Sequence, residues 1–363
     1  MIKRRIFLRD TLAGVAGLAL TSEHAFANIV VPQKRRLGVA LVGLGYYSTD
    51  LLAPGLQLTK NCYLAGIVTG TPAKAEKWKQ QYNIPDKNIY NYDSFQSLAD
   101  NPAIDIVYIV LPPSMHAAYS IKGAAAGKHV WCEKPMAMTA KECQSMIDAA
   151  SKNKVQLTVG YRMHHEPNTQ QIMKIAKDLP YGKLQNLTAA AGYREGRTDH
   201  WKQKKAMGGG AMYDMGVYPL NAARYSSGME PIAVTARAST TRPEIYKEVE
   251  ETMEFDLEFP GGATAKCETS FGRGINDLQV NFQKGSYTLS PFQAYSGING
   301  ETSDGMKLNK KIPHQQAKQM DDDALAITTK SKPLVPGEEG LRDIRIVEAI
   351  YRSVKEKKQI SLQ

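Results

Sequence analysis

The chain of 363 residues is long enough for two domains and is basic overall, with 46 Lys and Arg residues against 36 Asp and Glu residues. Its formal net charge of +10 comes from scattered side chains, without blocks of like charge or interleaved aromatic patches. This pattern indicates a solvated surface and excludes a nucleic-acid footprint, while the positive excess modestly favours anionic ligands such as phosphate-bearing cofactors.

The first 27 residues have the pattern of a removed export signal. Arg4 and Arg5 form a twin-arginine pair, residues 11–20 form a short apolar stretch, and Ala25-Phe26-Ala27 is a small-x-small cleavage site. The stretch is too short to span a membrane, which takes roughly 18 apolar residues. The twin-arginine route carries folded proteins out of the bacterial cytoplasm. We therefore expect a periplasmic protein without stable membrane association, folded around its cofactor before it meets the twin-arginine export machinery.

From residue 37 to residue 160, apolar strand-like runs alternate with helical patterns. The predicted strands are Leu37–Gly43, Tyr63–Val68, Ile104–Leu111, His129–Cys132 and Val155–Gly160. The predicted helices are Pro72–Tyr82, an Ala-rich segment at 115–126, and a helix capped by Thr139 with Glu142 in a capping box. This alternation predicts an α/β domain with a doubly wound parallel sheet of the Rossmann type.

After residue 160 the pattern changes to successive strands joined by tight turns such as Pro260-Gly261-Gly262. The predicted strands are Leu184–Gly192, Ile232–Ser239, Met253–Phe259, Ala263–Ser270 and Leu278–Phe282. One helix is expected at 213–226, a loop at 296–320, and a last helix from Glu338 to about Lys357 that ends the chain. Glu338 and Glu339 suit a helix N-terminus, so we assign them no chemistry. The pattern predicts an α+β domain with a largely antiparallel open sheet.

Five segments follow from these patterns. They are a signal peptide (1–27), a short N-terminal arm (28–36), a Rossmann NADP-binding domain (37–160), an α+β domain for substrate and oligomerisation (161–335) and a C-terminal helix (336–363).

A glycine-containing loop follows the first predicted strand and opens a helix. In this context we expect a dinucleotide to bind along the loop formed by Gly43, Leu44, Gly45, Tyr46, Tyr47 and Ser48. Gly43 permits the tight turn, and Gly45 lets the backbone approach a pyrophosphate at the helix N-terminus. The third motif position is Ser48 instead of Gly or Ala, and a small residue still permits close packing of helix on strand.

The end of the second strand selects between nicotinamide cofactors. An NAD-specific domain places Asp or Glu there, to accept a hydrogen bond from the ribose. This chain has Thr69-Gly70-Thr71 followed by Lys74, whose hydroxyl, N–H and ammonium groups suit a 2′-phosphate. The sequence therefore predicts NADP, tightly bound, over NAD. The alternative is that Lys74 is an ordinary solvated helix lysine.

Two clusters carry the candidate chemistry. Glu133-Lys134-Pro135 lies just past the carboxyl end of a predicted Rossmann strand, where open α/β sheets bind ligands. A second cluster begins with three glycines at 208–210, which leave room for a ligand or another backbone, and continues to Asp214 and Tyr218. Residues four apart on a helix project from one face. A lysine ammonium favours the phenolate of a nearby tyrosine, so Lys134, Asp214 and Tyr218 form a plausible proton relay. The alternative is that Tyr218 is only a core residue.

The cysteines Cys62, Cys132, Cys143 and Cys267 have no metal-ligand spacing, and we expect no metal site. Cys132 lies on an apolar strand and is interpreted as a small core residue. Whether any two cysteines pair stays open.

These motifs resemble the Gfo/Idh/MocA oxidoreductase family, and within it the glucose–fructose oxidoreductase branch, over essentially the whole chain after the signal. The similar stretches are Val42–Tyr47, Leu111–His116, Gly127–Met136, Gly160–Arg162, Gly208–Tyr218 and Pro336–Gly340. The resemblance implies that Lys134 and Tyr218 act in proton transfer with support from Asp214. It also implies that Leu111, Pro112, His116, Glu133, Arg162 and Trp201 lie near the cofactor.

Two details qualify the resemblance. Many family members have His where this chain has Tyr218, and the tyrosine matches the glucose–fructose oxidoreductase branch. That branch has a long proline-rich arm that helps to shield its cofactor, whereas only residues 28–36 with the single proline Pro32 precede the first strand here. Burial of the cofactor by the arm, and oligomer contacts made by it, are therefore in doubt.

Export constrains the chemistry, because the periplasm offers no dependable supply of soluble nicotinamide cofactor. We expect a ping-pong sugar oxidoreductase in which bound NADP oxidises an aldose to a lactone and then reduces fructose or another aldose to an alditol. A redox-neutral glycoside hydrolase or lyase of the same family, and a non-catalytic sugar-binding protein, are the alternatives. A homodimer or homotetramer is expected mainly from the resemblance.

Overall fold

Two β-sheets organise the part of the chain that the computed structural model describes, residues 35–362. The predicted signal peptide (1–27) and most of the predicted arm (28–36) lie outside the described residues. At the start of the described part, the Arg36 guanidinium donates to the Cys62 carbonyl at 3.0 Å. This bond attaches Arg36 to the first residue of a strand in the first sheet.

The first sheet has six strands in the order β3-β2-β1-β4-β5-β6, and every neighbouring pair is parallel. Its strands are β1 (Leu37–Val42), β2 (Cys62–Val68), β3 (Ile89–Tyr90), β4 (Ile106–Ile109), β5 (His129–Cys132) and β6 (Leu157–Val159). The strand order reverses between β1 and β4, which is the point where doubly wound sheets bind ligands. The predicted parallel sheet is confirmed.

Helices join several of these strands, and one of these helices has a side-chain cap. The helices are α1 (Ala53–Leu56), α2 (Pro72–Tyr82), α3 (Pro113–Ala125) and α4 (Ala140–Lys152). At α4 the predicted capping box is present, because the Glu142 N–H donates to the Thr139 hydroxyl at 3.1 Å and the Thr139 N–H donates to the Glu142 carboxylate at 2.9 Å. A π-helical turn at Ser48–Leu52 leads into α1.

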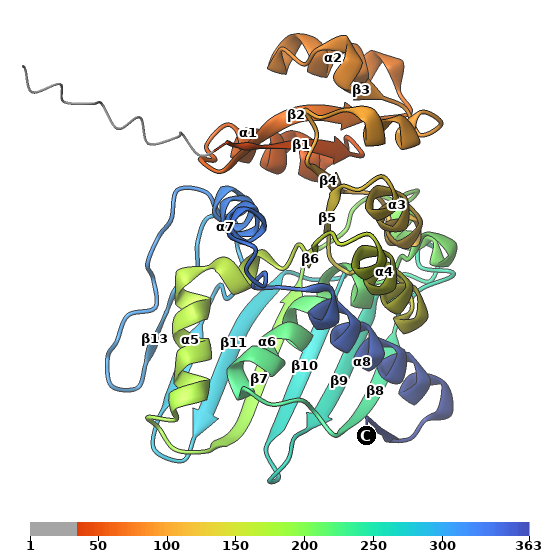
Figure 1. Cartoon of the computed structure of the whole chain (residues 1–363). Coiled ribbons are helices and arrows are strands. Elements are labelled where there is room, and N and C mark those ends of the chain that lie inside the picture. The colour runs from red at the N-terminus through yellow and green to blue at the C-terminus, as the bar shows by residue number, and fades with distance from the viewer. Residues whose placement is uncertain (1–34, 363) are drawn as a thin grey trace, which may run out of the picture. The chain divides into compact units, whose positions relative to one another are not determined.

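The second sheet has eight strands in the order β13-β12-β11-β7-β10-β9-β8-β14, and only the β7–β10 pair is parallel. Its strands are β7 (Leu184–Gly192), β8 (Ala233–Ser239), β9 (Thr252–Glu258), β10 (Thr264–Ser270), β11 (Ile275–Phe282), β12 (Ser286–Leu289), β13 (Gly300–Thr302) and β14 (Ile360–Ser361). The predicted, largely antiparallel sheet is confirmed. Figure 1 shows α6 (Val217–Ser227) and α8 (Gly337–Glu356) across one face, with α5 (Pro167–Asp178) beside α6.

The expected loop at 296–320 is wrong in part. The segment contains β13, and helix α7 (Gln315–Thr329) begins within it. The residues that α7 buries include Gln315, Gln319 and Asp323 beside Ala317, Met320 and Ala324, so polar residues interrupt its apolar pattern. The last helix does not end the chain either, because β14 follows α8 and pairs with β8. Helix α5 and the short strands β3 and β12 were also absent from the sequence prediction.

A buried ion cluster joins α6 to α8 within the layer of helices that covers the second sheet. The Arg224 guanidinium lies 2.5 Å from an oxygen of Asp343, which is fully buried, and 2.6 Å from an oxygen of Glu339. The Asn221 amide donates to the other Asp343 oxygen at 3.0 Å. Glu339 therefore has a specific partner across two helices, and the helix dipole alone does not explain it.

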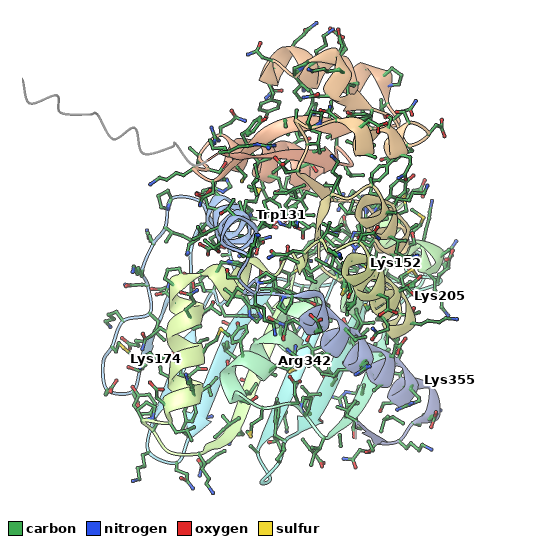
Figure 2. All side chains as sticks on the ribbon, in the orientation of Figure 1. Trp131, Lys152, Lys174, Lys205, Arg342 and Lys355 are labelled. Carbon is green, nitrogen blue, oxygen red and sulfur yellow. The ribbon has the colours of Figure 1, made fainter. Side chains whose placement is uncertain are left out.

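The surface charge is distributed as the sequence predicts. Figure 2 labels Lys152 on α4, Lys174 on α5, Lys205 before the glycine-rich loop and Lys355 on α8, and all four are exposed. Within residues 35–362 no helix is both long and apolar enough to cross a membrane. All four cysteines are buried and unpaired, and Cys132 is a core residue as predicted.

We expect Arg224→Met to lower the free energy of unfolding by about 3–5 kcal/mol, because it leaves the fully buried Asp343 without a counter-charge, whereas Glu339 keeps Arg342. Urea unfolding followed by circular dichroism measures this loss. Arg237→Met is the matched control, since Arg237 pairs with Glu254 on an exposed surface and should change stability by no more than about 1 kcal/mol. Equal losses in the two variants would contradict the assignment.

Candidate active site

The glycine loop after β1 has the geometry of a dinucleotide-binding turn. Gly43 has φ +95°, and a Cβ there would lie 2.4 Å from the Val110 carbonyl oxygen, so only glycine fits. A Cβ at Gly45 would meet no atom within 4 Å, which leaves open space above that backbone. The chain turns helical at Tyr46, and the first N–H groups of a helix have no partner within it. The loop therefore fits a pyrophosphate.

Residues predicted to select the cofactor lie beside this loop, at the end of the neighbouring strand β2. The Lys74 ammonium donates to the Leu44 carbonyl at 3.2 Å, which brings its charge to the glycine loop. The Thr69 hydroxyl accepts from the Thr71 N–H at 3.2 Å, and Gly70 is exposed. Ser48 is buried and donates to the Gly43 carbonyl at 2.6 Å, so the small third residue does permit close packing.

His116, at the start of α3, lies between the loops that follow β4 and β5. One ring nitrogen is 2.7 Å from the Leu111 carbonyl oxygen and the other is 2.8 Å from the Pro135 carbonyl oxygen. Burial lowers the pKa of His116, although both carbonyl contacts raise it in part. The neutral ring carries one N–H, so it donates to one of these carbonyls at a time and links the Leu111–Pro112 segment to the loop that carries Lys134.

Lys134 extends from the end of β5 to a helix of the second sheet. Its ammonium donates to the Asp214 backbone carbonyl at 2.6 Å and lies 3.9 Å from the Asp214 Oδ1 atom. The Tyr218 ring centroid is 4.7 Å from the same ammonium. Burial by itself lowers the pKa of Lys134, but the nearby Tyr218, Asp214 and Glu133 outweigh burial and raise it. Lys134 is therefore a cation at neutral pH, and the three predicted catalytic residues do meet.

Glu133, the residue before Lys134, faces the interior. Its carboxylate accepts from the Tyr108 hydroxyl at 2.6 Å and from the Lys134 N–H at 3.3 Å. A Cβ on Gly160 would lie 2.6 Å from Glu133 Oε1, so a glycine directly after β6 makes space for the carboxylate. Burial raises the pKa of Glu133 to about 7, against the lowering effects of Tyr108 and Lys134.

The glycine-rich loop at 208–210 is closely packed against protein groups. A Cβ on Gly208 would lie 2.7 Å from Pro113, one on Gly209 would lie 2.5 Å from the Lys202 carbonyl oxygen, and one on Gly210 would lie 2.6 Å from Glu250 Oε1. Of the two uses that the sequence left open, the glycines serve approach by the protein itself. The Glu250 carboxylate also accepts from the Met212 N–H at 2.9 Å, which fixes the start of the next helical turn.

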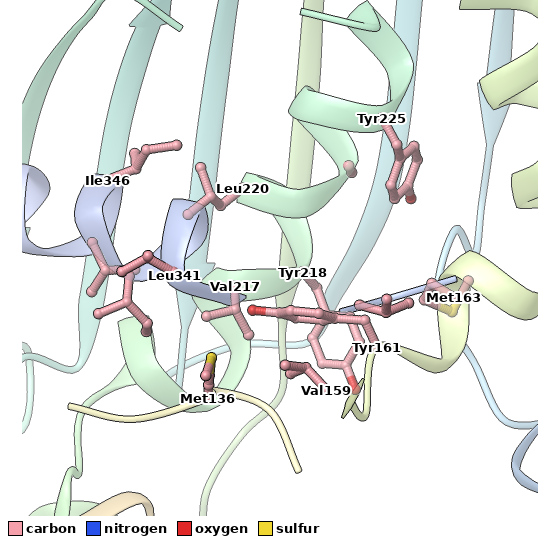
Figure 3. Packing of buried hydrophobic residues seen from close by; sticks show 14 of the residues in the cluster. Met136, Val159, Tyr161, Met163, Val217, Tyr218, Leu220, Tyr225, Leu341 and Ile346 are labelled. Carbon is pink, nitrogen blue, oxygen red and sulfur yellow. The ribbon is translucent and has the colours of Figure 1, made fainter. Parts of the chain in front are cut away.

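That turn is π-helical over Met212–Gly216 and leads into α6, where Tyr218 lies in the first turn. A π turn leaves carbonyl groups outside the regular α-helical ladder, and π turns occur frequently at functional sites. The Asp214 carbonyl turns to Lys134 here. Figure 3 shows Tyr218 beside Val217, Val159 and Tyr161 in the core. Tyr218 is thus a core residue by packing, yet its ring also lies against two cations.

The second cation is Arg162, which follows β6 and is buried. Its guanidinium carbon is 5.7 Å from the Tyr218 ring centroid and 4.6 Å from that of Tyr295. Its charged nitrogens donate to the amide oxygens of Gln293, at 3.1 Å, and Gln315. The Tyr295 ring is 6.2 Å from Tyr47 of the glycine loop. The glycine loop and the Lys134 cluster are therefore joined by continuous side-chain contacts.

The sequence prediction missed Lys202 and Tyr193. The Lys202 ammonium lies 2.6 Å from Asp214 Oδ2, 2.7 Å from the Tyr193 hydroxyl and 5.7 Å from the Trp201 ring centroid. Trp201, which the resemblance implied, thus lies at the edge of this cluster. The usable signal for Lys202 was its position next to Trp201 and shortly before the glycine-rich loop. Tyr295, Gln293 and Gln315 gave no signal. Among the described residues no group of His, Cys, Asp or Glu side chains could hold a metal ion.

Comparisons with known proteins define the class of this site. The description "Oxidoreductase family, NAD-binding Rossmann fold" matches residues 37–161, and "GFO/IDH/MocA C-terminal domain" matches residues 169–288. The chain belongs to the Gfo/Idh/MocA oxidoreductase family.

Several relatives cover most of the chain. It is 37% identical to an aldose–aldose oxidoreductase from Caulobacter crescentus whose crystal structure contains glycerol, with a TM-score of 0.87 over 90% of this chain and 100% of that one. A D-xylose 1-dehydrogenase [NADP(+)] of Haloarcula marismortui is 27% identical over 89% of this chain and 92% of the relative. A D-glucoside 3-dehydrogenase of Escherichia coli is 25% identical over 90% of this chain and 97% of the relative.

The raised pKa of Glu133 predicts a pH dependence of stability. Because the folded protein binds the proton of Glu133 more tightly than the unfolded chain does, stability falls as pH rises from the ordinary glutamate value to about 7. The loss amounts to about 3 kcal/mol and is complete above that range. We expect Glu133→Gln to remove this loss, measured as urea unfolding at about pH 5 and about pH 8.

Glu338→Gln, which changes an exposed glutamate, is the control and should retain the wild-type pH dependence. If the free energy of unfolding changed with pH equally in Glu133→Gln and in wild type, Glu133 would be ionised in the folded protein over this whole pH range.

Proposed function

We propose that this protein is an NADP-dependent sugar oxidoreductase that oxidises an aldose at C1 to a lactone and then reduces a second sugar, fructose or an aldose, to an alditol. The observation that carries the proposal is the position of Lys134, whose ammonium lies between Asp214 and Tyr218 at the carboxyl edge of the parallel sheet. The aldose–aldose oxidoreductase and sugar dehydrogenases among the relatives support the substrate class.

The residues at the glycine loop fit a nicotinamide dinucleotide. The open space above Gly45 suits a pyrophosphate, and the end of β2 holds Thr69 and Gly70 with no acid, while Lys74 brings a positive charge to the loop. An ammonium without a nearby carboxylate favours the 2′-phosphate of NADP over the ribose hydroxyl of NAD. When bound, the cofactor supplies the acceptor of the hydride in the first half-reaction and its donor in the second.

The protein's own residues handle the proton. Since Lys134 remains an ammonium, it cannot accept a proton, and the base in this proposal is Tyr218. As the C1–H bond gives up a hydride, the C1 hydroxyl proton moves to the phenolate oxygen of Tyr218, which becomes a phenol, and the C1–O bond becomes the lactone carbonyl. Lys134 donates a hydrogen bond to the substrate oxygen in both directions. In the second half-reaction the acceptor carbonyl gains a hydride at carbon and the stored proton at oxygen.

The compartment gives a reason for the paired half-reactions. We propose that the protein is exported to the periplasm by the twin-arginine route, on the pattern of residues 1–27. A cofactor that is exported with the folded protein has to return to its starting oxidation state while it stays bound. The reduction of a second sugar does this. Redox-neutral chemistry would meet the same need, and one relative, 25% identical over 73% of this chain, is a 2,7-anhydro-N-acetylneuraminate hydratase.

We also propose a homodimer or homotetramer in which a second copy covers the open face of the eight-stranded sheet. Alternate residues of its central strands, such as Thr188, Asp256 and Lys266, face outward and are exposed. The face is polar, so the contact in this proposal is hydrogen-bonded and wet.

The deciding experiment follows the near-ultraviolet absorbance of reduced nicotinamide in protein purified without added nucleotide. We expect a rise on adding glucose and a fall on adding fructose or another aldose, with lactone and alditol formed in equal amounts. Lys134→Met and Tyr218→Phe should each slow the rise by about 10²–10⁴-fold with the cofactor still bound. No bound cofactor, even after denaturation, would overturn the resident-cofactor proposal. Free reducing sugar from a glycoside, without lactone, would favour the redox-neutral alternative.

The cofactor preference has its own test. We expect Lys74→Met to lower the preference for NADPH over NADH by roughly tenfold to a hundredfold, because one charge-assisted hydrogen bond to the 2′-phosphate is lost. Fluorescence titration of protein stripped of nucleotide measures both affinities. Lys77→Met, which removes another exposed lysine of α2, is the control. An unchanged ratio in Lys74→Met would make Lys74 an ordinary surface lysine.

A further inference from the structure

Lys202 makes the closer of the two lysine ion pairs to Asp214, and the proposed chemistry does not use it. It lies in the short helical turn Trp201–Gln203, between β7 and the glycine-rich loop. Its side chain is 17% exposed, and its ammonium lies 2.6 Å from Asp214 Oδ2. It also donates to the Tyr193 hydroxyl at 2.7 Å. A lysine held this closely and this far from solvent has a defined position.

Asp214 is shared unequally between two lysines. Lys202 holds Oδ2 at 2.6 Å, whereas Lys134 is 3.9 Å from Oδ1. The short bond of Lys134 goes instead to the neutral Asp214 backbone carbonyl, at 2.6 Å. Coulomb attraction falls with distance, so the carboxylate charge is mostly engaged by Lys202. Lys134, which lies beside Tyr218, is therefore held by a hydrogen bond to a backbone carbonyl and not by a close ion pair.

The surroundings keep this carboxylate ionised. Burial by itself raises the pKa of Asp214, but Lys202 and then Lys134 oppose burial and bring the pKa below its ordinary value. Tyr193 keeps its proton, because burial and the two adjacent carboxylates raise its pKa. Its hydroxyl lies 3.0 Å from Asp214 Oδ2 and 3.1 Å from Glu195 Oε2, and its single proton serves one of them at a time.

Other charged groups lie near Asp214. Glu250 accepts from the Met212 N–H, and burial raises its pKa, which weakens its negative charge. Glu195 is paired with Arg197 on the β7 side, so neither adds much net charge at Asp214. His200, in the same loop, has a pKa lowered by burial and by Arg197 and Lys202. Lys134 reaches Asp214 from the loop that follows β5. Lys202 is therefore the group whose removal changes the charge at Asp214 most.

We propose that Lys202 is a positioning residue for the proposed reaction: it engages the Asp214 carboxylate so that the Lys134 ammonium stays free to donate to the substrate oxygen beside Tyr218. This inference rests on the proposed function. Without Lys202, the carboxylate turns to Lys134 as its only close cation, and Lys134 is drawn away from the substrate oxygen. The pKa of Asp214 then rises as well, because its largest stabilising neighbour is gone.

The test compares Lys202→Met and Lys202→Arg with the matched control Lys204→Met. Lys204 lies two residues away and pairs with Asp199 at an exposed position. Infrared difference spectra of the holoenzyme without sugar, recorded against pH, follow carboxyl protonation. We expect Lys202→Met to show a carboxyl group titrating at higher pH than in wild type, and the signal to vanish in Lys202→Met/Asp214→Asn. Lys202→Arg and Lys204→Met should resemble wild type.

Stopped-flow absorbance of the sugar half-reaction supplies the second readout. In Lys202→Met we expect the rate at saturating sugar to fall roughly tenfold to a hundredfold, with its acidic limb moved to higher pH and the half-saturating sugar concentration little changed. Lys202→Arg should restore most of the rate. A purely structural role would lower thermal stability without moving the pH profile.

Three results would overturn the inference: an unchanged carboxyl titration, an unchanged pH profile, or a raised half-saturating concentration with an unchanged maximal rate, which would mean that Lys202 binds the sugar directly. If the wild-type protein reacts with no sugar, the proposed function is wrong. The carboxyl titration still decides in that case whether Lys202 controls Asp214, since a shift supports this and no shift refutes it.

Discussion

A buried lysine ammonium needs partners. At Lys134 those partners lie on the helical segment that packs against the second sheet. The end of β5 brings the side chain to the edge of the parallel sheet, while Asp214 and Tyr218 come from the helix on the second sheet. Because a charged group without partners is costly to bury, the two parts of the structure are coupled through this contact. The loops, glycines and helical turns around it all serve to hold that contact in place.

The support behind the contact is built from polar groups as much as from apolar packing. Glu250 fixes the glycine-rich loop through the Met212 N–H, and the π-helical turn then aims the Asp214 carbonyl at Lys134. Farther along α6, Arg224 ties the same helix to α8 through Asp343. Such buried networks are stabilising only when every member is paired, which makes the position of α6 well defined.

The site has an excess of positive charge. Lys134 and Lys202 lie beside the ionised Asp214, and Arg162 lies against the Tyr218 ring. Burial raises the pKa of the nearby Glu133 to about 7, which weakens its negative charge. An environment of this kind stabilises negative charge that develops on an oxygen, as in the oxidation of a hydroxyl or the reduction of a carbonyl. The same field attracts a phosphate-bearing cofactor, in line with the basic composition of the chain.

Local sequence determined the elements that are governed by short-range chemistry. The apolar runs of β1, β2 and β5, the capping box at Thr139 and the glycine turn at Gly43 depend on neighbours within a few residues, so they could be predicted. The motifs also pointed to Lys134, Asp214 and Tyr218 as one group.

Tertiary structure decided what depends on residues far apart in the chain. Helix α7 buries three glutamines and one aspartate among its apolar residues, and Gln315 and Gln319 bond to distant segments, so its apolar pattern is interrupted. The sequence places Lys202 next to Trp201, but its partner Asp214 is fixed only when β7 and the π-helical turn come together. The three glycines at 208–210 gave a choice between ligand and protein, and only packing against Pro113 and Glu250 settled it. Sequence specifies local conformation directly, whereas a charge's partner is specified only by the completed fold.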